Sequence, residues 1–314
     1  MERIFVNLKR FEVPTERGGV CPSPSPEEWI NSVIGQCVDL GYGDNDAVRL
    51  VFFLPEAMIV TAKNSLNSLP AEKRSTLEIG CQGVFREDIR PGGNFGAFTT
   101  NLPATAAANL GCTWAIIGHS EERNDKMGVL REFAPEIDDN SDLAAKALVA
   151  IDRLMNQEVL RALEAGLNVL ICVGETAAER GNGDFASKQR RIETVLRRQV
   201  LTGLEGVQHL LGEKQIVIGY EPIWAIGPGK VPPGKEYVQY VTQTIKAIVR
   251  ENMSLEVPVV YGGGLKKENA GMLGSITRLD GGLVALTRFG GQIGFDPQEL
   301  DEIIQAYLGS RGDS

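Results

Sequence analysis

Short β-branched and apolar runs recur along the whole chain, separated by longer segments with helical spacing of their apolar residues. The runs with the length and composition of buried strands cover residues 3–7, 48–54, 77–82, 113–118, 167–173, 215–218, 257–261 and 282–286. Strands that alternate with helices form a parallel sheet, and eight such units close into a barrel. We therefore predict an α/β fold, a (β/α)8 barrel.

The chain of 314 residues is longer than such a barrel needs, since about 250 residues are typical. One domain over residues 1–314 therefore fits if the loops are enlarged. Proline, glycine and polar residues outside the periodic segments indicate where the extra length lies. We expect insertions near residues 10–25, 86–95, 124–142 and 287–295.

Charge and composition exclude several classes of partner. The 32 Lys and Arg against 41 Asp and Glu give a net charge of −9, which argues against nucleic acid or an anionic membrane surface as partner. No apolar run approaches the ~20 residues that span a bilayer. The first residues enter a strand without a secretory h-region, and the five cysteines form no Cys-x-x-Cys pair. We expect a cytoplasmic protein with reduced thiols and no bound metal.

The stretch 219–230 carries the strongest chemical signal. The run 215–218 leads to Glu221, and Pro222 ends the strand one residue later, which holds the carboxylate at a strand tip. An apolar segment with Gly227 follows, as in a flap that closes over a site. A carboxylate in this setting suits a general base under a lid that excludes water. The alternative is a surface loop with an ordinary acidic residue.

This stretch resembles the catalytic base and mobile loop of the triosephosphate isomerase family. Four further motifs of that family occur in order: Val6-Asn7-Leu8-Lys9, Gly118-His119-Ser120-Glu121, Cys172-Val173-Gly174-Glu175 and Tyr261-Gly262-Gly263-Gly264. The resemblance covers residues 4–304 and implies a TIM barrel, whose active site lies at the carboxyl ends of the strands. It also implies an isomerase that needs no cofactor.

The resemblance assigns a role to each residue of these motifs. Glu221 would be the base that moves a proton between neighbouring carbons, and His119 would donate to the carbonyl oxygen. Lys9 would place a positive charge beside the enediolate and the phosphate, and Asn7 would add a hydrogen-bond donor. The alternatives are a structural histidine, a solvated surface lysine and an asparagine that forms a turn.

Residues 120–122 have the composition of a first helical turn directly after His119. The N–H groups of such a turn disfavour a charged imidazolium, which favours a neutral histidine. Glu121 would hold Lys9 or Ser120 from the side.

The phosphate-binding segments depart from the family pattern. A phosphate needs several N–H donors with little steric cover, so the candidate contacts are Gly227, Gly263 or Gly264, and the backbone of Ala285 and Leu286, with Arg288 close behind. A serine is expected at Gly264, and two glycines at Ala285 and Leu286. Arg288 either supplies charge to the phosphate or is solvated outside it. The family also carries arginine at the position of Glu122, and Val231-Pro232-Pro233 makes a stiffer hinge.

The implied reaction interconverts dihydroxyacetone phosphate and D-glyceraldehyde 3-phosphate through an enediolate, as in glycolysis and gluconeogenesis. The partner is a small phosphorylated sugar. Residues 96–99 match the loop with which the family forms homodimers, so a dimer is implied. Two alternatives stay open: an isomerase for a longer tetrulose phosphate, and a non-catalytic paralogue that binds a sugar phosphate.

Overall fold

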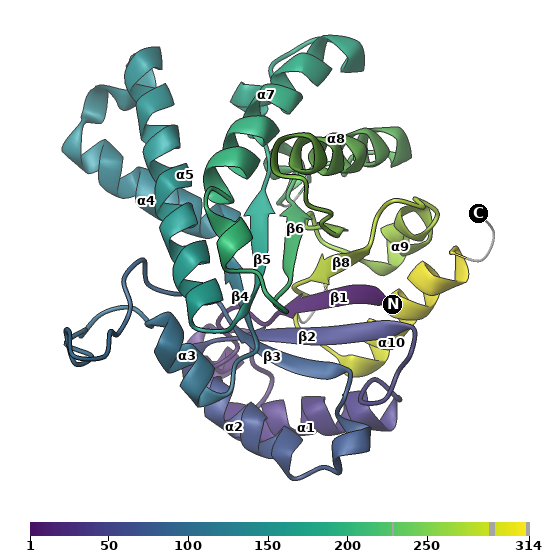
Figure 1. The fold of residues 1–314 in the computed structure, drawn as a ribbon. Coiled ribbons are helices and arrows are strands. Elements are labelled where there is room, and N and C mark those ends of the chain that lie inside the picture. Colours follow the sequence, from purple (N-terminus) through teal and green to yellow (C-terminus); the bar gives the residue numbers. More distant parts are fainter. Residues whose placement is uncertain (228, 289–292, 312–314) are drawn as a thin grey trace. The chain divides into compact units, whose positions relative to one another are not determined.

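The computed structural model describes residues 1–227, 229–288 and 293–311, and its strands form one closed parallel barrel in chain order (Figure 1). The strands are β1 (Glu2–Asn7), β2 (Val48–Leu54), β3 (Leu77–Cys81), β4 (Trp114–Ile117), β5 (Asn168–Val173), β6 (Ile216–Tyr220), β7 (Val259–Tyr261) and β8 (Gly281–Val284). The predicted (β/α)8 fold is confirmed. Pro228 of the predicted lid and residues 289–292 of the last insertion lie outside the described residues.

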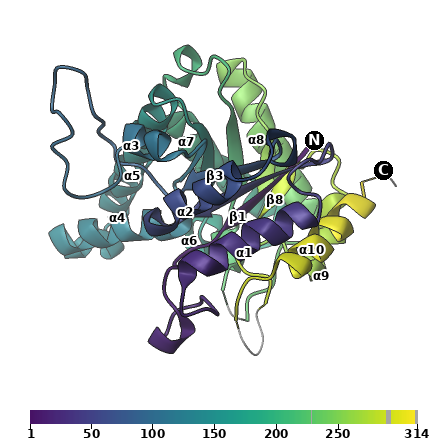
Figure 2. The same cartoon turned by 90° about the horizontal axis from the view of Figure 1, so that it is seen from below.

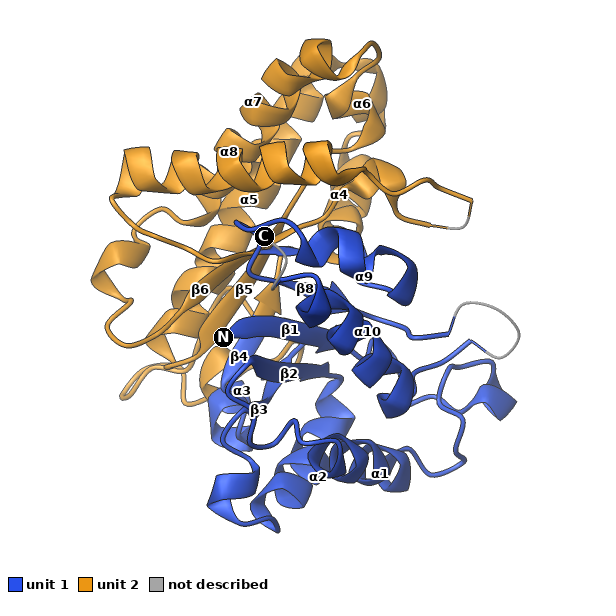
Figure 3. Ribbon diagram, turned by 90° about the vertical axis from the view of Figure 1, so that its right-hand side faces the viewer, with its two compact units in different colours: residues 1–82, 106–115, 260–314 blue, residues 83–105, 116–259 orange. Residues whose placement is uncertain are grey.

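The helices that separate the strands have the following bounds. They are α1 (Pro26–Asp39), α2 (Glu56–Asn67), α3 (Ala104–Leu110), α4 (Ser120–Phe133), α5 (Ser141–Glu164), α6 (Ala177–Arg180), α7 (Phe185–Gly203), α8 (Lys235–Met253), α9 (Lys267–Gly274) and α10 (Pro297–Gly309). The chain divides into two compact units (Figure 3). Unit 1 comprises residues 1–82, 106–115 and 260–314, and unit 2 comprises residues 83–105 and 116–259.

In unit 1, α2 packs on α1, α1 on α10, and α10 on α9 (Figure 2). The helix starts follow capping rules that the sequence displays. The Ser25 hydroxyl accepts the Glu28 N–H at the start of α1, with proline as the first helical residue. Asp296 caps α10 in the same way, through the Gln298 N–H.

The predicted enlarged loop near residues 10–25 folds back on unit 1. The Cys21 N–H donates to the Val13 carbonyl, and the Thr15 N–H donates to the Cys21 carbonyl. Phe11 is buried and stacks on Trp29 of α1, with ring centroids 4.7 Å apart. The insertion is therefore an ordered part of the core of this unit.

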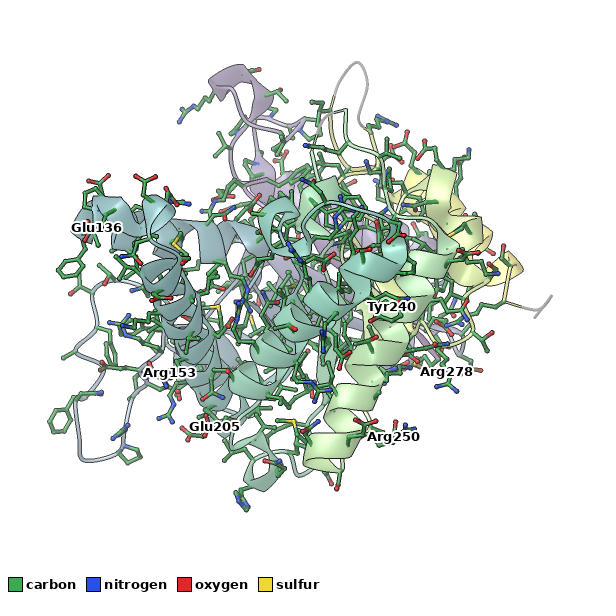
Figure 4. All side chains as sticks on the ribbon, turned by 90° about the horizontal axis from the view of Figure 1, so that it is seen from above. Glu136, Arg153, Glu205, Tyr240, Arg250 and Arg278 are labelled. Atoms are coloured by element: carbon green, nitrogen blue, oxygen red, sulfur yellow. The ribbon has the colours of Figure 1, made fainter. Side chains whose placement is uncertain are left out.

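In unit 2, α4, α5, α7 and α8 pack one on the next. The residues near 124–142, expected as an insertion, extend α4 to Phe133 and then form a 3₁₀ turn, η3 (Pro135–Asp139). The turn and the flanking helix ends share a small apolar cluster of their own, formed by Ala134, Ile137, Ala147, Met127, Leu130, Leu143 and Ala144. Charged side chains such as Glu136, Arg153 and Arg250 lie on the exposed faces (Figure 4).

Strand eight is shorter than predicted. We expected it to continue through Leu286, but it ends at Val284, which is paired with Val6 of β1. The backbone of Thr287 and Arg288 instead bonds to Gly294 inside the following loop. Ala285 and Leu286 therefore belong to this loop and not to the sheet.

Two further findings concern the chain as a whole. All five cysteines are buried and unbridged. Among the helices of residues 1–227, 229–288 and 293–311, none combines the length and the apolar character that crossing a bilayer requires.

Candidate active site

Glu221 lies at the tip of β6, as predicted, and its side chain is only 2% exposed. Its backbone N–H donates to the carbonyl of Val173 at the end of β5, at 2.8 Å. The carboxylate accepts the Ser120 N–H through Oε2 at 2.8 Å, while Oε1 lies 3.2 Å from Nε2 of His119. Gly174 permits this arrangement, because a Cβ at that position would overlap the Glu221 carbonyl group.

His119 occupies the turn between β4 and α4 and is the N-cap residue of that helix. Its Nδ1 accepts the Glu121 N–H at 3.3 Å. A ring nitrogen that accepts a hydrogen bond carries no proton, so the neutral ring holds its proton on Nε2. That nitrogen is the one that faces Glu221. The predicted helical first turn after His119 is confirmed, and it orients the ring.

Ser120 and Glu121 contribute differently to this pair. Ser120 acts through its backbone N–H, which holds Glu221. The Glu121 side chain is 69% exposed, and its Oε2 lies 3.7 Å from Nδ1 of His119. The expectation that Glu121 holds Lys9 or Ser120 stays a prediction.

The segment after Glu221 begins with a 3₁₀ turn, η5 (Ile223–Ala225), and leads through Gly227 toward α8. Gly227 has a φ of +118° with open space around it, so its backbone and not its surroundings requires glycine. Ile226 and Val231 expose apolar side chains. These features agree with a lid, and Gly227 as a phosphate contact stays a prediction.

One buried carboxylate, Glu175, is bonded to residues on both sides of the predicted lid. Its Oε1 accepts Trp224 Nε1 at 2.8 Å from the start of the lid and the Tyr237 hydroxyl at 2.6 Å from α8 beyond its end. The Tyr220 hydroxyl of β6 adds a third bond at 2.9 Å. Burial raises the pKa of Glu175, although the three donors favour its ionised form. The guanidinium of Arg180 lies 3.7 Å above the Trp224 ring.

Asn7 and Lys9 lie in unit 1, where β1 ends. Asn7 is buried, and its Oδ1 accepts both the Lys9 N–H and Nε2 of Gln82, each at 3.0 Å. Gln82 Nε2 also donates to the Lys9 carbonyl at 2.8 Å. Lys9 has a φ of +36°, which this local network holds in place. The two residues are therefore rigidly placed, and their catalytic roles stay predictions.

The remaining phosphate candidates also lie in unit 1. Gly264 has a φ of +91°, and its carbonyl accepts Nδ2 of Asn269 at 3.0 Å. Gly263 precedes it after β7, while Ala285 and Leu286 follow β8.

Arg288 is engaged by two carboxylates of its own unit. Its Nε lies 2.6 Å from Glu299 Oε1, and its Nη2 lies 2.9 Å from Asp296 Oδ2. The hydrogen bond and charge of Glu299, with those of Asp296, raise the pKa of Arg288. A phosphate contact by Arg288 stays a prediction. The positive charge that such a phosphate would meet is already balanced by Asp296 and Glu299.

Sequence reasoning missed Gln82, Glu175 and Tyr237. Gln82 follows the last residue of β3, and an amide at a strand tip is a signal that could have been used. Glu175 stands in one of the family motifs but received no role from the sequence. Nothing in the sequence relates Tyr237 to Glu175, because their contact depends on how α8 packs.

Comparison with known proteins places this chain in a family. The chain matches the family model described as Triosephosphate isomerase over residues 36–305. The triosephosphate isomerase of Pelodictyon phaeoclathratiforme is 34% identical over 194 residues, which cover 61% of this chain and 64% of the relative. That of Cupriavidus pinatubonensis is 37% identical over 193 residues, or 60% and 66% of the two chains. These two matches span slightly less than two thirds of the relatives' length.

A longer match and a solved structure complete the comparison. The triosephosphate isomerase of Prosthecochloris aestuarii is 31% identical over 259 residues, which cover 81% of this chain and 88% of the relative. The crystal structure of triosephosphate isomerase from Bartonella henselae superposes with a TM-score of 0.63 over 98% of both chains at 22% identity, a likeness of fold. The chain therefore belongs to the triosephosphate isomerase family.

Proposed function

We propose that the chain interconverts dihydroxyacetone phosphate and D-glyceraldehyde 3-phosphate. The observation that carries this proposal is the pair formed by Glu221 and His119, with Glu221 Oε1 at 3.2 Å from the Nε2 that bears the imidazole proton. A carboxylate base beside a neutral imidazole is the arrangement that proton transfer next to a carbonyl requires. Triosephosphate isomerase is itself the best-known example of such a pair, so the pairing follows the family and is not a new mechanism.

The reaction then proceeds by two proton transfers. Glu221 takes a proton from the carbon next to the carbonyl group, which gives an enediolate, and returns it to the neighbouring carbon. His119 donates its Nε2 proton to the carbonyl oxygen on which charge develops and takes a proton back from the neighbouring hydroxyl group, so that the second proton moves between the two oxygens and the ring ends neutral. Because Nε2 and the Ser120 N–H both face the Glu221 carboxylate, substrate must replace these contacts before either group can act.

Asn7 and Lys9 enter the proposal through family membership. Lys9 would stabilise the enediolate and the phosphate by its charge, and Asn7 would donate a hydrogen bond. The two contacts to Asn7 both use Oδ1, so the amide NH2 group is the part of the side chain left for a donor role. Gly227, Gly263, Gly264, Ala285 and Leu286 would supply the phosphate contacts.

A coupled isomerase assay with both triose phosphates tests the proposal, with wild type compared against Glu221→Gln. We expect fast turnover that the substitution lowers by about 10²–10⁴-fold, the usual contribution of a general base. Full activity of Glu221→Gln would overturn the assignment of the base. Wild-type protein that binds a phosphorylated sugar without turnover would favour the non-catalytic paralogue.

A second candidate keeps the chemistry and changes the substrate to a phosphorylated tetrulose. It is favoured by the loop after β8, where Ala285 and Leu286 replace the expected glycines and Arg288 pairs with carboxylates. The added bulk of Leu286 and the pairing of Arg288 with carboxylates would change how the phosphate is bound, while the base Glu221 is unaffected. A strong preference for the four-carbon compound in the same assay would select this candidate.

Two further proposals rest on family membership alone: a cytoplasmic location and a homodimer. Phe95, in the loop between β3 and α3, is 87% exposed, as expected of a residue that a second subunit covers. Sedimentation of wild type and Phe95→Ser at micromolar concentration tests the dimer. A wild-type monomer would contradict it.

A further inference from the structure

The residue before His119 is held by two side chains of α4. The Gly118 N–H donates to Oε2 of Glu122 at 2.7 Å, and Nε of Arg123 donates to the Gly118 carbonyl at 2.9 Å. These are the two polar groups of the Gly118 backbone. The φ of +74° at Gly118 is one that other residues rarely adopt, so the turn into His119 needs such support.

Arg123, which holds the carbonyl, is fixed by a buried network. Its Nη1 lies 2.6 Å from Oδ1 of Asp152, and its Nη2 donates to the Cys172 carbonyl at 3.2 Å. Asp152 is fully buried, and its Oδ2 accepts Nε of Arg198 at 2.8 Å. Buried polar groups with this many partners leave little freedom to the side chain.

Glu122, which holds the N–H, is fixed through its other oxygen. Nζ of Lys126 lies 2.8 Å from Glu122 Oε1 and 3.2 Å from Glu158 Oε1. Burial and the neighbouring Glu122 raise the pKa of Glu158 to about 9. At neutral pH Glu158 therefore keeps its proton, and Glu122 is the ionised partner of Lys126.

We propose that Glu122 is a positioning residue for His119, which fixes the Gly118 N–H and so directs Nε2 of the imidazole toward the reacting atoms. The inference rests on the proposed isomerase function, since it gives Glu122 a part in that reaction. Arginine, which the family resemblance leads us to expect at this position, has only donors and could not accept the Gly118 N–H. The positioning role that we propose for Glu122 therefore requires the glutamate of this chain and could not be filled by the arginine expected from the family.

Two substitutions distinguish a role of Glu122 in holding the Gly118 N–H from a role of its charge in the ion pair with Lys126. Glu122→Asp keeps the charge beside Lys126 but shortens the side chain, so that it no longer reaches Gly118. Glu122→Gln keeps the length and the accepting oxygen but loses the charge. We expect Glu122→Asp to lower kcat about 10–100-fold with KM within about two-fold, because small displacements of a catalytic group are costly. Glu122→Gln should stay within about three-fold of wild type.

Lys126→Met gives an intermediate case. It removes the cation that fixes Glu122 Oε1 but keeps the oxygen that accepts the Gly118 N–H, so we expect a lower Tm and a fall in kcat smaller than that of Glu122→Asp. If Glu122→Gln is slower than Glu122→Asp, the charge and not the bond to Gly118 matters, and the proposal is overturned.

The imidazole ring gives a readout that does not depend on turnover. The chain has two histidines, His119 and the exposed His209, so nitrogen NMR of labelled rings resolves both, with His209 as internal reference. We expect the His119 ring signals to shift in Glu122→Asp and to stay in place in Glu122→Gln. An unshifted ring in Glu122→Asp would overturn the proposal. If wild type turns over neither triose phosphate, the proposed function fails, while the ring shifts still decide the role of Glu122.

Discussion

The strand tips of β4 and β6 in unit 2 differ in kind from the loop after β8 in unit 1. At the tips of β4 and β6, backbone groups orient the side chains: the Ser120 N–H holds Glu221, and the Glu121 N–H holds His119. In the loop after β8, side chains hold one another, since Arg288 is bound by Asp296 and Glu299. The first region carries the family motifs around His119 and Glu221 apart from Glu122, and the second departs from the family pattern at Ala285 and Leu286.

The difference bears on which substitutions each region tolerates. Contacts made by backbone N–H groups persist when the side chains of the same residues are exchanged, so Glu221 and His119 keep these two contacts when the side chains of Ser120 and Glu121 change. Contacts made by side chains are rebuilt at each substitution. We expect substitutions in the first region to lower kcat and exchange of Arg288 in the second to leave kcat and KM nearly unchanged.

The largest effect is expected from His119→Gln. Loss of the imidazole removes the proton donor at the carbonyl oxygen, so kcat should fall about 10²–10⁴-fold with little change in KM. Steady-state kinetics with both triose phosphates would measure it. The control is His209→Gln, at the exposed end of the 3₁₀ turn η4 (Val207–His209), which should leave kcat unchanged. Equal effects of His119→Gln and His209→Gln on kcat would contradict the assignment of the proton donor to the first region.

Gly174→Ala tests whether the first region depends on backbone packing. The added Cβ would overlap the Glu221 carbonyl, so β5 and β6 must separate, at a cost of about 3 kcal/mol of unfolding free energy. Displacement of Glu221 should also lower kcat. Urea denaturation and kinetics measure the two effects. Gly128→Ala in α4, where no atom lies near the new Cβ, is the control and should not destabilise. A stable, fully active Gly174→Ala protein would contradict the expected overlap.

Glu158→Gln tests the protonation of the cluster behind Gly118. The raised pKa of about 9 means that the folded protein keeps a proton that the unfolded chain releases at lower pH. Stability due to Glu158 is therefore present below its unfolded pKa and is lost as the pH rises toward 9. Glutamine removes this dependence, so the variant should gain about 2–5 kcal/mol over wild type at pH 8 and nearly nothing at pH 4. Thermal unfolding across this range measures it, and parallel curves would refute the protonated Glu158.

Arg288→Met probes the second region and has the smallest expected effect. Because the charge of Arg288 is already balanced and its side chain is 48% exposed, the Tm should change little. KM for the triose phosphates should change by less than about three-fold. Lys267→Met, which breaks an exposed pair with Glu302, is the matched control. A ten-fold rise in KM for Arg288→Met alone would show that Arg288 binds the phosphate and would remove the contrast between the regions.

The barrel and the strand-tip positions of Glu221 and His119 could be predicted because they depend on short-range signals. Short apolar runs that alternate with helical segments predict the strands, and Pro222 directly after Glu221 marks a strand tip. The predicted end of β8 was wrong, because the bonds of Thr287 and Arg288 to Gly294 compete with the sheet and leave no mark on hydrophobicity. Glu122 stood out in the sequence only as a departure from the family. Its contacts to Gly118 and Lys126 depend on the direction in which α4 leaves His119, which no local pattern encodes.

The position of Glu175 has a consequence for the kinetics of the lid. Trp224 and Tyr237 are bound by the same oxygen, so the intervening segment behaves as a ring closed at one point and not as a strand with two independent ends. The configurational entropy of such a ring is lower than that of an open segment, because the entropy of closure is already lost in the folded protein. Breaking either bond alone therefore opens the ring and frees one end of the segment, whereas loss of the Glu175 carboxylate frees both ends at once.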